Sequence, residues 1–446
     1  MTRHSSQPLP GSPRHVLLWA SILDSLWFIP ALGALAGVIL AVVTLSFPIA
    51  DKLEDTWIHP ILFSGEPESA RAVLSTIAGS LITVTGVVFS VTIVTLQLAS
   101  TQFTPRVMRG FIADRTNQSV LAIFIGTFTY TLLVLGGLGS PGLGDDGVPV
   151  IAVTLSLVLL LVSVGALILF INRSARSVQV STILRREAEQ GVNRDNGIFP
   201  AGVGAGVPDA DFTLPTGDAA SVRARGAGYV QAVDGGGLLE LAVGEDMLVE
   251  MKVAVGEFLF PDKVVLRVWP AERVDEQLHG KLLDLLVVGP ERTPQQDVEF
   301  SIGAVADVAV RALSTGINDP TTAMLAIDRL TEILRSVAGT GEAALRVDDS
   351  GVPRLIAQRT TFESAAGLAF DQIRLHGAGN PAIVKKILDS MLDLLPLLSP
   401  REAAAIRREA DRLLAAARGS SPREDLPDIE GLAARVLRGS AGVQTS

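Results

Sequence analysis

The sequence predicts a multi-pass α-helical membrane protein with four transmembrane helices, followed by an α+β region. Two observations lead to this prediction. Residues 1–172 are mostly apolar and contain four stretches long enough to cross about 30 Å of hydrocarbon, which takes about 20 residues. From residue 173 onward charged residues are dense, as expected of a region in water. With 446 residues, the chain is also too long for one compact domain.

These changes in composition divide the chain into five parts. We expect an N-terminal segment at 1–21, a transmembrane domain at 22–172, a connecting helix and linker at 173–217, a small α+β module at 218–270 and a mainly helical domain at 271–446.

The four apolar stretches are residues 26–47, 72–99, 120–138 and 148–171. The first follows a basic start, but it is too long for the apolar part of a cleaved signal peptide. We therefore expect it to be retained as a membrane span.

The loops between these spans alternate in charge. Bases gather before the first span (Arg3, Arg14), after the second (Arg106, Arg109, Arg115) and after the fourth (Arg173, Arg176, Arg185, Arg186). The loop at 51–71 has more acids than bases, and the loop at 139–147 has two acids and no base. Because basic loops stay in the cytoplasm, both termini are predicted to be cytoplasmic. Residues 104–115 also have the pattern of a short amphipathic helix, whose arginines would lie near anionic headgroups.

The second span differs from the others because small and polar residues follow one side of it. At about 100° per residue, these residues fall within about 140° of one another on a helix. They are Ser75, Thr76, Gly79, Ser80, Thr83, Gly86, Ser90 and Gln97. Such a side favours close packing of helices through small-xxx-small pairs, or it lines a pore or water-filled cavity in an oligomer. No charged residue lies inside the span, which argues against a proton relay or ion-coupled transport.

The region after residue 217 shows alternating strand and helix patterns. We expect strands at 228–233, 248–255 and 264–268, with Asp234 capping a short helix between the first two. A helix at 275–288 and a hairpin at 345–360 follow. Further helices are expected at 297–314, 319–338, 362–375, 381–395, 400–417 and 426–437, with capping-box spacing at Ser399–Glu402 and Ser421–Glu424.

One turn in the helical domain has features of a binding site. Asp319 is a good N-cap and Pro320 suits the first helical position, so the turn after Arg311 and Asn318 begins a new helix. Free N–H groups at that helix start could bind an anion or a lipid headgroup. The alternative is a capped connection between two helices, with Asn318 in the turn.

Composition excludes several functions. The chain has no cysteine, which rules out disulfides, thiolate metal sites and thiol nucleophiles. The five His residues show no metal-ligand spacing, and the net charge of −10 argues against nucleic acid. Phosphate-loop, zinc-protease and serine-hydrolase motifs do not occur. We therefore expect no cofactor, no metal and no enzymatic activity.

Two stretches resemble a known family. Residues 96–109, LQLASTQFTPRVMR, and 307–323, DVAVRALSTGINDPTTA, are similar to bacterial predicted membrane proteins called domain of unknown function 2254. Thr315 stands where that family usually has proline. The resemblance covers almost the whole chain. It implies an integral inner-membrane protein with a large cytoplasmic region, and it implies no activity.

We therefore expect a homo-oligomer in the lipid bilayer that is channel-like or permeable, with a cytoplasmic regulatory region. The alternative is a non-conducting scaffold or sensor whose cytoplasmic domain binds a partner or ligand. A membrane enzyme is the least favoured of the three.

Overall fold

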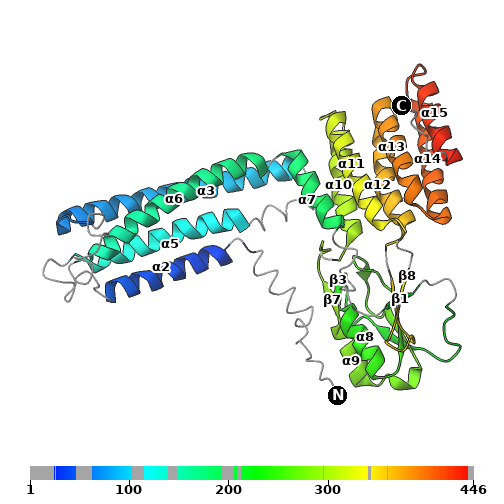
Figure 1. Ribbon diagram of the computed structural model, residues 1–446, viewed down its shortest axis with the longest axis horizontal. Helices are drawn as coiled ribbons and strands as arrows, with labels where there is room; N and C mark the ends of the chain where they lie inside the picture. The colour runs from blue at the N-terminus through cyan, green and yellow to red at the C-terminus, as the bar shows by residue number, and fades with distance from the viewer. Residues whose placement is uncertain are drawn as a thin grey trace. The chain divides into compact units, whose positions relative to one another are not determined.

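The computed structural model describes residues 25, 27–46, 63–102, 115–138, 148–177, 179–192, 205–207, 212–294, 296–339, 343–358 and 360–439. The described chain divides into two units between Gln179 and Val180 (Figure 1). We call them the membrane unit, which precedes this point, and the C-terminal unit, which follows it. Each unit has its own hydrophobic core.

The membrane unit consists of long apolar helices. They are α2 (Phe28–Ser46), α3 (Pro67–Gln102), α5 (Arg115–Gly137) and α6 (Val150–Ser177). All four are long and apolar enough to cross a membrane, so the prediction of four candidate spans is confirmed. The direction in which they cross stays a prediction.

Helix α5 is the centre of the membrane unit, since it contacts α2, α3 and α6. Its buried residues therefore point in several directions. Phe124 packs in one apolar cluster with residues of α3 and α6, whereas Tyr130 and Val134 pack in a second cluster that includes α2.

Glycines bring α2 and α5 into very close contact. Gly33 and Gly37 lie four residues apart on α2, opposite Ala122 and Gly126 on α5. A Cβ added to Gly37 would lie 2.4 Å from the carbonyl oxygen of Gly126. One added to Gly33 would lie 2.4 Å from that of Ala122. Small residues let the two backbones meet, as is usual for packed membrane helices.

The C-terminal unit contains two sheets. The smaller one has the order β5 (Phe258–Leu259), β3 (Gly228–Val233), β7 (Leu286–Gly289). The larger one has the order β1 (Ala205–Val207), β8 (Ala343–Val347), β9 (Pro353–Gln358), β4 (Leu248–Met251), β6 (Val264–Trp269), β2 (Ala220–Arg223). The expected hairpin is thus β8–β9, and β9 pairs in parallel with β4. Residues distant in sequence therefore complete one sheet.

Helix α8 (Gly235–Gly244) follows β3 in the chain, and helix α9 (Glu276–Asp284) precedes β7. A short 3-10 turn covers Ala271–Arg273. The side chain of Asp234 accepts a hydrogen bond from Gly237 N, which confirms it as the cap of α8. The expected helix at 275–288 is wrong in its last turn. Residues from Leu286 form β7 instead, because this β-branched run pairs with β3. The strand expected at 248–255 ends at Met251.

The rest of the unit is helical (Figure 1). Its helices are α7 (Val180–Val192), α10 (Val298–Ala312), α11 (Pro320–Val337), α12 (Phe362–Gly377), α13 (Pro381–Leu394), α14 (Pro400–Ser420) and α15 (Leu426–Arg438), with a 3-10 turn at Leu395–Leu397. Helix α7 packs on α10 and α11 and buries Ile183, Leu184 and Ala188.

One of the two predicted capping boxes forms. Ser399 and Glu402 cap α14 reciprocally. The prediction of a capping box at Ser421–Glu424 is wrong, because α15 starts later, after Asp425. The hydroxyl of Ser421 instead donates to the carbonyl oxygen of Ala378, at 2.7 Å.

Side-chain contacts of Gln296 and Asp297 join the smaller sheet to the helices. The side chain of Gln296 accepts from Val233 N at 2.9 Å and donates to Val233 O at 3.2 Å, as a neighbouring strand would. Next to it, Arg292 forms an ion pair with the buried carboxylate of Asp297, the N-cap of α10. These contacts tie β3 to the start of α10.

Candidate functional site

The polar side of α3 faces outward from the membrane unit. The eight residues of this side are all exposed, namely Ser75, Thr76, Gly79, Ser80, Thr83, Gly86, Ser90 and Gln97. The opposite side supplies the buried residues, including Leu74, Leu81 and Val88. We call the eight exposed residues the polar face of α3.

Within the described residues, no other helix of the chain covers the two glycines of this face. A Cβ added to Gly79 or Gly86 would have no atom within 4 Å. Among the helices that the structure describes, close packing through glycines occurs between α2 and α5. The small residues of α3 are therefore not covered by any described part of the chain.

The hydroxyls of the polar face are partly satisfied by their own helix. Thr76 Oγ1 donates to Ala72 O at 2.8 Å, and Thr83 Oγ1 donates to Gly79 O at 2.9 Å. Val87 and Val94 are also exposed and, at about 100° per residue, fall in the same sector. The face is thus a mixture of small, polar and β-branched side chains.

A second set of polar side chains lies inside the membrane unit, and sequence reasoning missed it. Tyr130 Oη donates to Ala152 O at 3.1 Å and lies 3.2 Å from Thr44 Oγ1. Ser163 Oγ donates to Thr127 Oγ1 at 3.3 Å. These bonds join α5 to α2 and α6. The sequence signal is the cluster of hydroxyls in the middle of the third span, which alone does not show whether they face lipid or protein.

The basic residues Arg106, Arg109 and Arg115, expected at the membrane interface, can be placed only in part. Arg106 and Arg109 lie outside the described residues, as does most of the expected amphipathic helix. Arg115 is the first residue of α5.

The turn between α10 and α11 has the predicted cap. Asp319 accepts hydrogen bonds from Thr322 N at 3.1 Å and from Thr322 Oγ1 at 2.6 Å. These bonds, the side-chain one first, hold the pKa of Asp319 below its ordinary value of 3.8. Pro320 is the first residue of α11, and Asn318 has a left-handed φ of 47°. Arg311 is half-buried in the last turn of α10 and already has an interaction partner.

The hydrogen bonds of Asp319 are those of a helix cap, which predicts a structural effect of mutation. Asp319→Ala is expected to cost about 1 kcal/mol, seen as a melting temperature lower by roughly 2–4 °C in full-length protein. Because the pKa of Asp319 is lowered, its contribution is complete above pH 3.8 and is lost as pH falls through the lower folded value. The neighbouring change Asn318→Gly, at a left-handed position, should leave the melting temperature unchanged. Equal melting temperatures for wild type and Asp319→Ala would contradict the cap.

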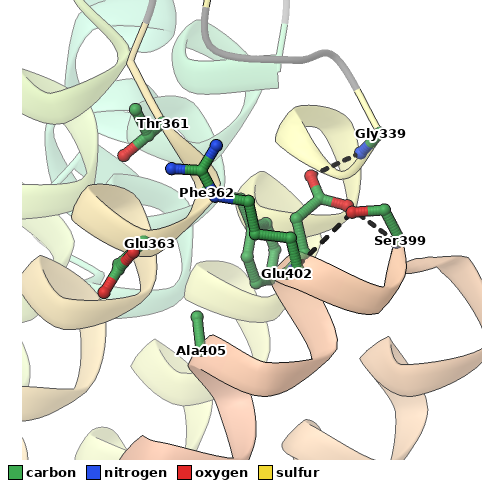
Figure 2. Close-up of a pocket in the computed structure, with 8 residues that line it drawn as sticks. Gly339, Thr361, Phe362, Glu363, Ser399, Glu402 and Ala405 are labelled. Carbon is green, nitrogen blue, oxygen red and sulfur yellow. Dashed lines mark hydrogen bonds between the residues drawn. The ribbon is translucent and has the colours of Figure 1, made fainter. Parts of the chain in front are cut away.

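A small cavity lies between the end of α11 and the first turns of α12 and α14. Its volume is about 200 Å³, and its lining includes Gly339, Phe362, Arg401 and Glu402 (Figure 2). The carboxylate of Glu402 already accepts from Gly339 N at 2.9 Å and from Ser399 N at 2.8 Å. The cavity is below the usual size of ligand pockets, roughly 300–1,000 Å³. Among the described residues, no cluster of His, Asp and Glu that could hold a metal is found.

Comparison with known proteins agrees with this architecture. The sequence profile of the family described as "Predicted membrane protein (DUF2254)" matches residues 23–393. The chain belongs to the DUF2254 family. The similarity seen in the two quoted stretches is therefore confirmed over most of the chain, and the protein is a membrane protein.

Mycobacterial proteins are similar to this DUF2254 member. Uncharacterised proteins of Mycobacterium bovis and of Mycobacterium tuberculosis H37Rv are each 30% identical to it over 430 residues. Each alignment covers 93% of this chain and 81% of the relative. No solved structure matches the chain.

Proposed function

We propose that the protein is a homo-oligomeric, channel-like membrane protein in which the polar face of α3 meets the same face of neighbouring copies and borders a path for a small solute or ion. In this proposal it lies in the bacterial inner membrane with both termini in the cytoplasm. The C-terminal unit is a cytoplasmic regulatory region, and no catalytic step is involved.

The outward exposure of the polar face is the observation that supports this proposal. A lipid-facing helix gains nothing from polar side chains, because hydrocarbon offers them no hydrogen-bond partner. Ser80, Ser90 and Gln97 are nevertheless exposed, while the apolar Leu81 and Val88 are buried. A second copy or water on this side would remove that mismatch.

Gln97 is the most informative residue of the face. A threonine hydroxyl can donate to its own helix, as Thr76 and Thr83 do, and so can tolerate lipid. A glutamine amide has two donor hydrogens and an acceptor oxygen. Its own helix, whose carbonyls are already paired, cannot satisfy all of them. Gln97 therefore favours contact with protein or water.

Crosslinking tests the subunit contact, and the chain's lack of cysteine makes it direct. Full-length Ser90→Cys protein is expected to form a disulfide-linked dimer on oxidation in membranes. The adjacent Phe89→Cys is the matched control, since Phe89 is 54% exposed but lies off the polar face. A disulfide requires Cα atoms about 4.4–6.8 Å apart. Equal crosslinking at both positions, or at neither, would contradict the contact.

Planar-bilayer recording tests the path. Purified wild-type protein is expected to give unitary currents, and Ser80→Leu, Thr83→Leu and Ser90→Leu are expected to reduce or abolish them. Phe89→Leu should leave them unchanged. Unchanged conductance in all three polar-face variants would overturn this function.

The second candidate is a non-conducting scaffold or sensor whose C-terminal unit binds a partner. It is favoured by the packing of α7 on α10 and α11, because α7 begins three residues after α6 ends. In this candidate function, the short connection from α6 to α7 transmits a binding event in the C-terminal unit to the membrane unit. Crosslinking of Ser90→Cys without any currents would select this candidate.

A further inference from the structure

Three aromatic side chains form an exposed cluster on the smaller sheet of the C-terminal unit. Tyr229 packs edge-on against Phe258 with ring centroids 4.9 Å apart, and Phe258 packs against Phe260 at 5.2 Å. Phe258 is 36% exposed and Phe260 is 64% exposed. We call these three residues the aromatic cluster. Exposed apolar groups of this kind mark surfaces of interaction.

The backbone holds the aromatic cluster in place. Tyr229 of β3 lies directly opposite Phe258 of β5 in the antiparallel register. After β5 the chain turns tightly, with Lys263 N donating to Phe260 O at 3.2 Å. Asp262, in a left-handed conformation with φ of 66°, donates its N–H to Ala224 O at 3.1 Å. Phe260 therefore projects from a well-fixed turn.

Two cationic side chains are held at the turn that carries Phe260. Lys263 forms an ion pair with Glu257, so this carboxylate is neutralised beside Phe258. Arg223 is exposed, and its Nη1 donates to Asp262 O at 2.8 Å. Arg223 and Lys263 thus lie at the same turn as Phe260, where their long cationic side chains can reach headgroup phosphates.

We propose that the aromatic cluster inserts into the headgroup region of the bilayer in which the chain's own spans lie. Aromatic rings flanked by arginine and lysine are the side chains that favour this interface. The bilayer is also always near, because the C-terminal unit is covalently attached to the spans. Attachment turns even weak insertion into stable contact by raising the effective concentration.

The size of the aromatic cluster argues for lipid over a second protein. Each partner in a stable protein interface buries about 800 Å². An aromatic side chain buries at most about 150–250 Å², and these three are already partly buried against one another. The cluster alone is therefore too small for a stable protein contact, but sufficient for shallow insertion of one or two rings.

Fluorescence from a single labelled cysteine tests this proposal, because the chain has no other cysteine. Full-length Phe260→Cys, labelled with the polarity-sensitive dye NBD, is reconstituted in liposomes with and without nitroxide-labelled lipid. We expect emission at shorter wavelength and strong quenching by the nitroxide lipid. The control is Val352→Cys, which is 43% exposed in the β8–β9 turn of the same unit and should show neither effect.

Two results would overturn the proposal. The first is equal emission at both positions with no quenching by nitroxide lipid. The second is a short-wavelength emission at position 260 that the nitroxide lipid does not quench and that disappears as protein is diluted with lipid, which indicates a second copy. Neither result bears on the currents or crosslinks expected from α3, so the two proposals fail separately.

Discussion

Replacing Gly37 with leucine is expected to disrupt the membrane unit. A Cβ at this position would lie 2.4 Å from the carbonyl oxygen of Gly126 and 3.1 Å from its carbonyl carbon. These are backbone atoms in the middle of α5, and no rotamer change can move them away. Helices α2 and α5 must therefore separate, which also weakens the contact between Thr44 and Tyr130.

The expected cost of Gly37→Leu is at or above the upper end of overpacking effects, about 3 kcal/mol. In detergent, full-length protein should melt lower by roughly 6–12 °C or aggregate during purification. The matched control is Gly165→Leu in α6, because a Cβ at Gly165 would meet nothing within 4 Å. Gly165→Leu should melt like wild type. Similar melting of both variants would show that the glycine contact between α2 and α5 contributes little.

Asp297→Ala is expected to cause the largest loss in the C-terminal unit. Asp297 is only 2% exposed, and its side chain accepts from Phe300 N at 2.9 Å as the cap of α10. It also accepts from Arg292 Nε at 2.5 Å and from Arg292 Nη2 at 2.9 Å. Alanine removes all three hydrogen bonds at once and leaves a half-buried guanidinium without its main partner.

Breaking a buried pair from one side costs about 3–5 kcal/mol. This predicts a melting temperature lower by roughly 6–20 °C for full-length Asp297→Ala. Asp297→Asn keeps the shape and an oxygen for capping, so its loss should be clearly smaller. Glu189→Ala is the surface control, because its partner Arg185 is 56% exposed and such pairs contribute less than about 1 kcal/mol. If Asp297→Ala costs no more than Glu189→Ala, the junction between the sheet and α10 is not important for stability.

Local chemistry accounts for what could be predicted along the chain. The four candidate spans follow from length and hydropathy, and the caps at Asp234, Asp319 and Ser399 follow from side-chain oxygens directly before a helix. Each depends on contacts within about four residues, which the sequence shows directly. The errors at Leu286 and Ser421 have the same origin. A short apolar run suits a helix or a strand, and a serine can cap or bond elsewhere.

The candidate site could be predicted only as a set of residues. The period of α3 shows that its small and polar residues share one side, and the structure places that side outward. The sequence does not show which side a neighbouring helix covers. Among the described residues, Gly33 and Gly37 of α2 pack closely against α5. Their four-residue spacing is the same as that of Gly79 and Thr83, so spacing alone does not show which helices pack together.

The sequence by itself determined that this is a membrane protein with four apolar helices, a polar face on the second of them and a mixed region after them. Only the tertiary structure decided which helix is central, that β9 joins β4, and that the other described helices leave the polar face of α3 uncovered. The reason is physical. Helix periods and caps depend on neighbours in the chain, whereas burial depends on which distant surfaces fit closely enough to exclude lipid or water.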